Sequence, residues 1–227
     1  MLESYPRSHL GDLPVDAAPS RSEIRSGAFY LGVKRILDIG VILLIAPLAL
    51  TIVGVLAFLI HRDGGKAFYG QKRLGRDGKI FTLWKLRSMV PDAALRLEEY
   101  LQDNPAARRE WDGTQKLKYD PRITRLGYYL RKYSADELPQ LWNVLIGDMS
   151  LVGPRPMFPE QRPLYPGTAY FSMRPGMTGL WQISERNGCT FAERATHDTR
   201  YATKMSFGTD IWILMMTAVV VLRGTGL

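Results

Sequence analysis

Cysteine and histidine are scarce in this chain. Its 227 residues include one cysteine and three histidines. A single cysteine, Cys189, cannot form an internal disulfide or a cysteine metal cluster, which fits a reducing compartment. The histidines, His9, His61 and His197, are scattered, and no two of them have the spacing of metal ligands. The sequence therefore excludes a disulfide scaffold and a zinc site of the common kinds.

Several motifs of nucleotide-binding and hydrolytic enzymes are also absent. No Gly-x-x-x-x-Gly-Lys-Ser/Thr occurs, which excludes a P-loop. No Gly-x-Ser-x-Gly occurs, which excludes the nucleophile elbow of the α/β-hydrolases. The first glycines after the apolar segment lack the strand, turn and helix setting of a dinucleotide fold.

The chain carries an excess of positive charge. Its net charge is +8, which predicts an anionic partner such as nucleic acid, acidic lipid head groups or a phosphorylated substrate. The basic residues cluster beside an apolar segment, and no nucleic-acid recognition motif is present. We therefore expect no nucleic-acid partner.

Residues 1–26 read as a disordered tail, because Pro, Ser, Asp and Arg occur there without apolar periodicity. The tail mixes acids with bases and has no apolar core, so it is not a signal peptide. We expect the mature chain to keep it.

An apolar segment from Ile36 to Ile60 is long enough to enter a membrane. Its one charged residue, Asp38, is costly in lipid unless it stays at the interface or is paired. Pro47 removes a hydrogen bond at the middle and kinks a helix. A kinked spanning helix remains an alternative, but Lys and Arg on both flanks favour a re-entrant helix over 27–62 that returns to the same face. Residues 63–227 would then form one cytoplasmic domain with interfacial helices.

A β-hairpin is predicted directly after this segment. One strand begins at Phe68, Gly75–Gly78 form the turn, and Ile80–Leu86 return. Lys85 and Arg87 are two residues apart, so a continuing strand would place both on one face. Such a pair could hold a phosphate or be a solvated basic edge, and both interpretations remain open.

Helical patterns dominate the rest of the chain. Residues 91–117 predict surface helices broken at Asn104-Pro105 and again at Asp112-Gly113. Gln182 is expected on a short strand. The apolar stretch Asp210–Leu222 is too short to span and is expected at the interface or on the core. The fold class is thus α+β and mainly helical, with a kinked re-entrant membrane helix, a small hairpin and surface amphipathic helices.

Two adjacent carboxylates, Asp136 and Glu137, lie where the pattern predicts a helix start. Ser134 with Glu137 matches a capping box, but Pro139 would then fall inside the helix. If Asp136 is itself the cap, Pro139 falls in the first turn, where its missing N–H costs little. In both alternatives the helix N-terminus would stabilise the ionised form of Asp136.

These acids suit chemistry on a phosphate. Neighbours on a helix point about 100° apart, so the two carboxylates cannot act as a symmetric pair. One can attack phosphorus while the other moves a proton or helps to hold a divalent cation. An anion that attacks a diphosphate needs Mg²⁺ and arginines to neutralise the phosphate oxygens, and Arg131 and Arg155 are candidates. The alternative is that Asp136 and Glu137 only cap a helix.

Several motifs occur together in an order that resembles a known family. They are KRILDIG before an apolar stretch with a central proline, KLRSM, DPRITRLG, SADELPQLWNVLIGDMSLVGPRP and RPGMTGLWQIS. From about Tyr30 to Leu227 the chain resembles the bacterial sugar transferases, the monotopic polyprenyl-phosphate phosphoglycosyl transferases. It is similar to the short members that start exopolysaccharide repeat units.

The resemblance implies transfer of a sugar 1-phosphate from a UDP-sugar to undecaprenyl phosphate, releasing UMP through an aspartyl-phosphosugar intermediate. It implies that Asp136 is the nucleophile and lies near the required Mg²⁺, that Glu137 is its partner, and that Pro47 breaks the re-entrant helix. The matching positions implied to bind substrate or phosphate are Lys85, Arg87, Arg122, Arg131, Arg155, Gln182, Asp198 and Tyr201.

The resemblance also implies a location and partners: the bacterial inner membrane, with the catalytic domain on its cytoplasmic face and in contact with membrane lipid. A homo-oligomer is compatible with it. A different class of function, a non-catalytic adaptor that binds anionic lipid or acidic polymer through a basic face, is the alternative.

One departure from the family bears on the sugar. Many members read Gln-(Val/Ile)-Ser-Gly-Arg where this chain has Gln-Ile-Ser-Glu-Arg over residues 182–186. The added carboxylate of Glu185 leaves the sugar open, although this variant is similar to galactose- or glucose-1-phosphate enzymes. Residues 93–118 have no assigned role.

Overall fold

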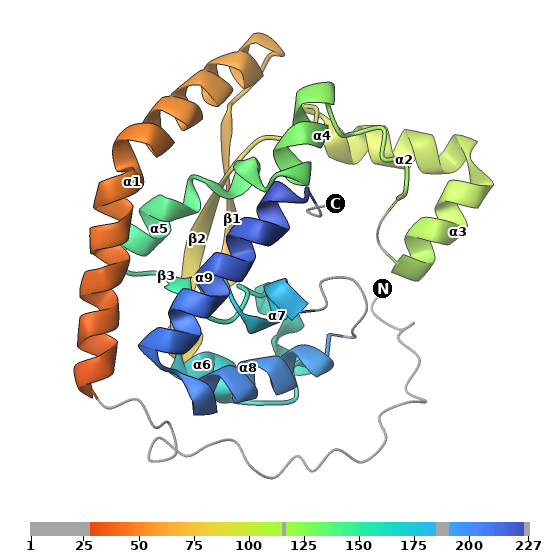
Figure 1. Cartoon of the computed structure of the whole chain (residues 1–227). Coiled ribbons are helices and arrows are strands. Elements are labelled where there is room, and N and C mark those ends of the chain that lie inside the picture. The colour runs from red at the N-terminus through yellow and green to blue at the C-terminus, as the bar shows by residue number, and fades with distance from the viewer. Residues whose placement is uncertain (1–27, 115–116, 185–190, 225–227) are drawn as a thin grey trace.

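The computed structural model describes residues 28–114, 117–184 and 191–224. The predicted tail and Glu185 lie outside these described residues. Figure 1 shows a long helix along one side of a mixed body and a pair of helices projecting on the other side. The chain is mainly helical, as predicted.

The long helix is α1, Ala28–Arg62, which begins before the apolar run and continues through Pro47. It is apolar enough, and long enough at 34 residues from Phe29, to cross a membrane by length and composition. In Figure 1 its ribbon lies against the body and curves along its length. The structure has one continuous helix here, so the re-entrant path remains a prediction.

Polar contacts fix the first half of α1 to the body. Lys34 Nζ lies 2.7 Å from Asp210 Oδ2, and Tyr30 donates to the same oxygen at 2.7 Å. Asp38, one turn further on, accepts a 2.7 Å hydrogen bond from the Ser150 hydroxyl. Both carboxylates are buried. Asp38 is therefore paired, as a buried acid on a membrane helix must be.

The second half of α1 packs on the same body through apolar contacts. Ile60 forms a buried cluster with Leu86 and Leu130, against which Leu56 of α1 also packs. Both halves of α1 thus contact one body.

The predicted hairpin is confirmed. Strands β1 (Phe68–Leu74) and β2 (Ile80–Leu86) pair antiparallel around the 3-10 turn η2 (Arg76–Gly78). Asp77 and Gly78 have φ of 59° and 73°, a region that Asp and Gly tolerate.

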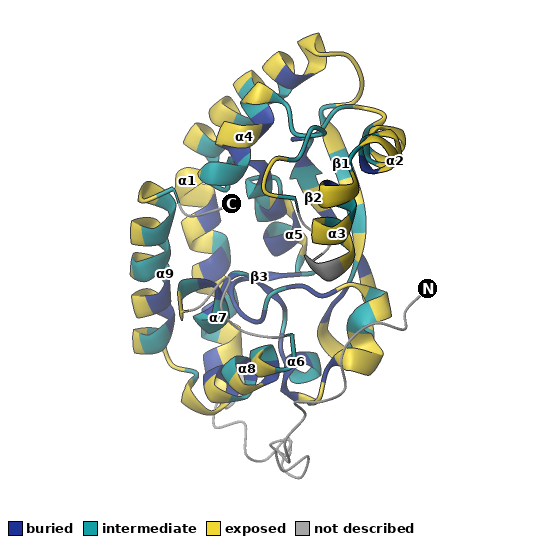
Figure 2. Ribbon diagram, turned by 90° about the vertical axis from the view of Figure 1, so that its right-hand side faces the viewer, coloured by how far each residue is buried: buried dark blue, intermediate teal, exposed yellow. Residues whose placement is uncertain are grey.

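The core contains a second, parallel strand pair that the sequence pattern did not predict. Strand β3 (Ser150–Val152) pairs with β4 (Gly176–Thr178). A Cβ atom on Gly176 would lie 2.1 Å from the Gly153 backbone nitrogen, so only glycine permits this approach. Helices α5 (Gln140–Ile146) and α9 (Phe207–Leu222) pack around it, and Figure 2 shows buried residues gathered there.

The remaining elements surround this core. Helices α2 and α3 form the projecting pair in Figure 1. The break at Asn104-Pro105 is confirmed, but the one at Asp112-Gly113 is wrong, because α3 continues to Thr114. The ranges are α2 (Ala93–Asp103), α3 (Pro105–Thr114), α4 (Arg125–Lys132), η3 (Ala135–Glu137), η4 (Pro159–Leu164), α6 (Ala169–Ser172), α7 (Leu180–Ser184) and α8 (Glu193–Lys204).

The strand predicted for Gln182 is wrong. Strand β4 ends at Thr178, and Gln182 lies within helix α7. The chain turns at Gly179, where an added Cβ would lie 2.1 Å from the Gly153 carbonyl oxygen. Only glycine therefore permits this close approach, and helix α7 begins at the next residue.

Asp210→Asn should destabilise the fold. It removes the charge that pairs with Lys34, whose side chain is only 10% exposed, and breaking a buried ion pair costs about 3 kcal/mol or more. Urea unfolding of the detergent-solubilised protein would measure the loss. The matched change Asp103→Asn, at an exposed site on α2, should stay within about 0.5 kcal/mol of the parent. Equal stability of the two variants would contradict the role of the Lys34–Asp210 pair.

Candidate active site

A wide cleft of about 1220 Å³ opens between the hairpin, α4, η3 and residues 117–125. Its described lining includes six basic and three acidic residues, so its charge favours an anionic ligand. These are Lys85, Lys118, Arg122, Arg125, Arg131 and Arg155, and Asp120, Asp136 and Glu137.

The acid pair lies on a single 3-10 turn, η3, in the wall of the cleft. Ser134 precedes it with a left-handed backbone (φ 55°) and makes no side-chain capping bond. Helix α5 begins only at Gln140, after Pro139, again without a side-chain cap. Neither turn carries a side-chain cap, so both capping alternatives are wrong. Leu138 and Pro139 lie between the acids and α5, so the acid pair is not at the N-terminus of α5 itself.

Lys85 takes the place of that helix N-terminus. Its Nζ atom lies 2.7 Å from Glu137 Oε1 and 3.3 Å from Asp136 Oδ2. Burial raises the pKa of the Asp136 carboxyl, and the positive charge of Lys85 opposes that rise. Burial would lower the pKa of Lys85, but the charges of Glu137 and Asp136 outweigh it and raise that pKa. Lys85 is therefore the cation that favours the carboxylate form of Asp136.

Arg131 precedes the acid pair in the sequence and Arg155 follows it. Both line the cleft together with the acids, as expected for phosphate-binding candidates. Arg155 Nη2 lies 3.8 Å from Glu137 Oε1, and its side chain is 39% exposed, so it can turn toward a ligand. Arg131 donates from Nε to the Ser88 hydroxyl at 2.9 Å. That bond orients the guanidinium at the edge of the cleft.

Arg122 also lines the cleft, but Asp120 binds it through two oxygens, at 2.8 and 2.6 Å. Its guanidinium also lies 4.9 Å from the Trp111 ring centre. Burial would raise the pKa of Asp120, but the hydrogen bonds from Arg122 lower it. The Asp-Pro-Arg motif thus builds a fixed wall whose charge is largely neutralised.

Arg87 does not accompany Lys85 into the cleft. Strand β2 ends at Leu86, so the alternation that would place both side chains on one face no longer applies. Arg87 donates to the carbonyl oxygens of Ile60 and Gly64, at 2.9 and 2.5 Å. It satisfies carbonyl groups at the C-terminus of α1.

Three other predicted positions lie within the body instead of on the cleft wall. Asp198 accepts a 2.8 Å bond from Tyr165, and burial raises the pKa of Asp198 to about 6. Tyr201 donates to Asp210 at 2.7 Å, and Gln182 is 2% exposed. In the described structure Asp198 joins α8 to the residue after η4, and Tyr201 joins α8 to α9.

Comparison with known proteins identifies the family. Residues 29–224 match the family model described as "Bacterial sugar transferase". The chain belongs to this family. It is 49% identical over 195 residues to a "UDP-galactose-lipid carrier transferase" of Erwinia amylovora, which covers 85% of this chain and 41% of that protein. It is 43% identical over 200 residues to the "Exopolysaccharide production protein ExoY" of Sinorhizobium fredii, which covers 85% of this chain and 87% of that one.

Coverage of the family's proteins is uneven. An "Undecaprenyl-phosphate galactose phosphotransferase" of Salmonella typhimurium is 47% identical over 195 residues, again 85% of this chain and 41% of the relative. This sugar transferase thus spans about two fifths of the longer curated relatives that it matches, and most of the shorter one.

The acid pair of the transferase suits a metal that is shared with a ligand. Among the described residues no group of three His, Cys, Asp or Glu could hold a metal alone. Mg²⁺ is commonly bound by one or two carboxylates together with substrate phosphates. Asp136 and Glu137 fit that arrangement.

Aromatic residues also line the cleft, and no sequence motif pointed to them as site residues. Tyr69 lies directly across the hairpin from Lys85 and lines the cleft beside Tyr128. Burial raises the pKa of Tyr69. The hairpin register, which follows from the position of the turn, was the signal that could have revealed Tyr69.

Lys85→Gln should raise the pKa of the Asp136 carboxyl further, because the nearest positive charge is lost. Carboxyl ¹³C NMR of aspartate-labelled protein, with the Asp136 resonance assigned from Asp136→Asn, would follow the titration. Lys79→Gln, at an exposed position of the same hairpin, should leave it unchanged. A lower or unaltered Asp136 pKa in Lys85→Gln would show that Lys85 does not set the charge of the site.

Proposed function

We propose that the chain transfers a sugar 1-phosphate from a UDP-sugar to undecaprenyl phosphate and releases UMP, as the first membrane step of exopolysaccharide or related glycan synthesis. The observation that supports this most is the acid pair, with Asp136 buried, that is bound to Lys85 in the wall of a cationic cleft. The galactose-carrier and ExoY names of its relatives agree with it.

The reaction has two displacements at one phosphorus atom. An Asp136 carboxylate oxygen attacks the phosphorus that bears the sugar, the phosphoanhydride bond breaks, and UMP leaves. An oxygen of undecaprenyl phosphate then attacks the same phosphorus and the Asp136–phosphorus bond breaks. The products are the undecaprenyl diphosphate sugar and the regenerated Asp136 carboxylate.

The chain's cations make the attack of one anion on another feasible. Lys85 favours the carboxylate form of Asp136. It lies close enough to both acids to remain paired with Glu137 when the Asp136 carboxylate attacks. Arg131 and the partly exposed Arg155 neutralise phosphate oxygens at the cleft wall. Bound Mg²⁺, held by Asp136 with the diphosphate, would supply further charge neutralisation. Glu137 orients Lys85 and Arg155.

The packing of α1 supports a re-entrant path. Its first half makes buried polar contacts with Asp210 and Ser150, and its second half packs at Ile60 on the same body. A straight crossing would carry one of these attachment points through the hydrocarbon, where polar partners are expensive. We infer that α1 dips into the inner membrane and that residues 63–227 face the cytoplasm, where UDP-sugars are available.

Asp136→Asn should lower UMP release from UDP-galactose by about a thousand-fold or more, because the nucleophile is lost. The assay contains undecaprenyl phosphate and Mg²⁺, and a panel of other UDP-sugars tests the sugar. Asp103→Asn on the exposed face of α2 should keep the parent rate. A membrane adaptor would bind anionic lipid equally well in both variants, and normal turnover in Asp136→Asn would refute the proposal.

The path of α1 can be tested by labelling a thiol at each end of the apolar segment and asking on which side of the membrane it lies. In a Cys189→Ser background, Phe29→Cys and Lys66→Cys place one thiol before and one after the apolar segment, both at exposed positions. A membrane-impermeant maleimide should label both thiols in inverted vesicles and neither in intact spheroplasts. Labelling of the two thiols from opposite sides would establish a spanning helix instead.

A further inference from the structure

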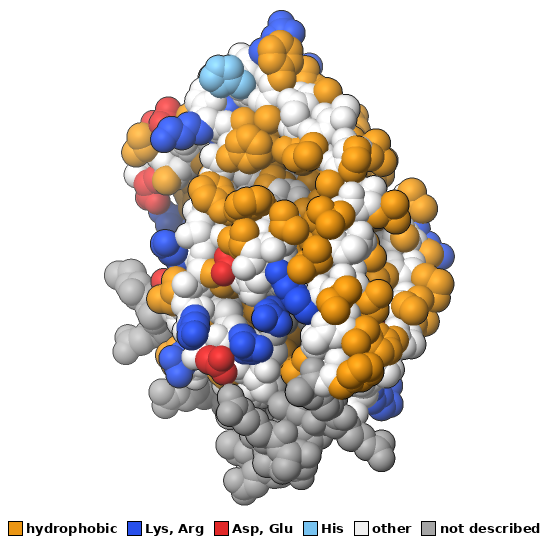
Figure 3. Space-filling view, turned by 90° about the vertical axis from the view of Figure 1, so that its left-hand side faces the viewer, with side chains coloured by type: hydrophobic (Ala, Val, Ile, Leu, Met, Phe, Trp, Pro, Cys, Tyr) orange, Lys and Arg blue, Asp and Glu red, His pale blue; other side chains and the backbone are white. Residues whose placement is uncertain are grey.

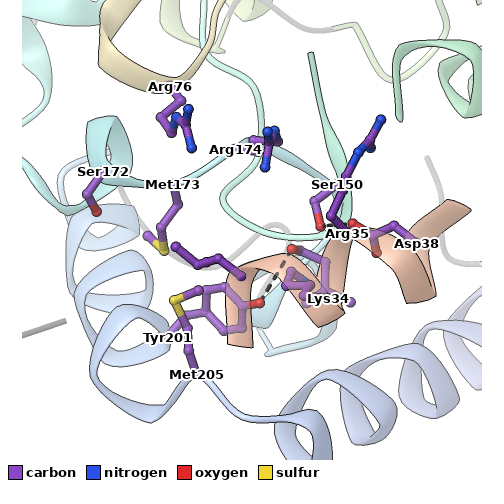
Figure 4. A pocket seen from close by; sticks show the side chains of 12 residues that line it. Lys34, Arg35, Asp38, Arg76, Ser150, Ser172, Met173, Arg174, Tyr201 and Met205 are labelled. Carbon is purple, nitrogen blue, oxygen red and sulfur yellow. Dashed lines mark hydrogen bonds between the residues drawn. The ribbon is translucent and has the colours of Figure 1, made fainter. Parts of the chain in front are cut away.

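A second, smaller pocket lies beside the first half of α1 and shares no lining residue with the cleft. Its wall combines α1, the hairpin turn, β3 and the segment before β4. Among the described residues that line it, four are basic and one is acidic. Figure 4 shows the side chains that surround it.

Three arginines line one edge of this pocket, with Arg174 between Arg76 and Arg35 in the view of Figure 4. In Figure 4, Arg35, Arg76 and Arg174 extend to the same side, away from Tyr201. Arg35 donates from Nη1 to the Val144 carbonyl oxygen at 2.5 Å and from Nη2 to that of Leu145 at 2.9 Å, and Arg174 donates from Nε to that of Gly147 at 3.0 Å. These bonds hold two of the arginines at the C-terminal end of α5 while leaving further N–H groups on each guanidinium.

The arginines repel one another. Burial lowers the pKa of Arg174, and the charges of Arg76 and Arg35 lower it further. Asp38, the acid of the pocket, opposes this effect, but its two oxygens accept bonds from the Ser150 hydroxyl and, at 3.4 Å, the Leu151 amide. Binding of an additional anion would therefore reduce the repulsion among the three arginines.

The neighbouring charges do not cancel the excess. Lys34 is paired with Asp210, so these two charges cancel and do not change the net charge around the pocket. Asp77 lies 3.5 Å from Arg76, but both side chains are more than two fifths exposed, so this ion pair is weak. Arg76 can therefore exchange Asp77 for a ligand at little cost.

Exposed apolar side chains occur at the pocket and on the two helices that supply or hold its arginines. Leu31 lines the pocket and is 38% exposed, Ile36 of α1 is 69% exposed, and Ile146 at the end of α5 is 51% exposed. Figure 3 shows basic side chains beside a broad apolar surface on this face of the molecule. A free anion would gain nothing from these groups, whereas an amphiphile with an anionic head would contact both kinds of surface.

We propose that Arg35, Arg76 and Arg174 bind the phosphate of an anionic phospholipid head group in the membrane surface that α1 enters. Guanidinium groups pair with phosphate oxygens through two parallel hydrogen bonds. The bound lipid would fix the first half of α1 at the interface, on the side of the body away from the acid pair. This inference rests on the proposed membrane insertion of α1 but not on the proposed reaction.

Short-chain phosphatidylglycerol provides the direct test. The purified full chain in a neutral detergent is titrated with dihexanoyl phosphatidylglycerol while tryptophan fluorescence follows thermal unfolding. The unfolding temperature of the parent should rise with lipid concentration. In Arg76→Gln the half-maximal concentration should increase about five-fold, because one basic residue at an anionic surface contributes about 1 kcal/mol. The exposed position of Arg76 makes this change compatible with folding.

Matched controls separate this site from other sources of binding. Arg109→Gln on α3 removes one exposed charge elsewhere, and Arg131→Gln alters the cleft; both should respond like the parent. Dihexanoyl phosphatidylcholine and inorganic phosphate should each give a smaller shift at equal concentration. The proposal fails if Arg76→Gln responds like the parent, if Arg131→Gln alone loses the response, or if inorganic phosphate matches phosphatidylglycerol. None of these readouts depends on UMP release.

Discussion

A buried ammonium group shared by two carboxylates determines how the cleft of this bacterial sugar transferase is built. Lys85 lies 2.7 Å from Glu137 and 3.3 Å from Asp136, so the end of β2 and the turn η3 must stay in contact. Loss of Lys85 would leave the buried Asp136 carboxylate without the cation that lies 3.3 Å from it, which is destabilising. The same contact opposes the rise in the pKa of Asp136 that burial causes, and so favours its carboxylate form. One interaction thus serves both the fold and the chemistry.

The membrane helix depends on the same body. Leu86, one residue after Lys85, is fully buried against Ile60 of α1, and Arg87 donates to the Ile60 carbonyl oxygen near the end of that helix. The element that presents the cation to the acid pair therefore also anchors α1.

The sequence predicted those elements whose signals are local. The hairpin followed from glycines at a turn and alternating residues up to Leu86, and the acid pair with its arginines followed from residue types close together in the chain. The parallel pairing of β3 with β4 was missed, because two three-residue strands carry no periodicity and depend on a close approach at Gly176. The capping alternatives for Asp136 failed because the local residue types did not reveal a left-handed Ser134 or a separate 3-10 turn before α5. The family resemblance implied that Lys85 is a phosphate ligand. Its contact with both acids depends on the packing of β2 against η3, which no local pattern encodes.

The most direct measurement is the mass of the peptide that contains Asp136 after the protein has been incubated with UDP-galactose and Mg²⁺ without a lipid acceptor. A nucleophilic Asp136 predicts a hexose-phosphate adduct on that residue, formed with release of UMP and lost when undecaprenyl phosphate is added. UMP release without any adduct on Asp136, or an adduct on another residue that forms and decays at the same rates, would contradict the central claim.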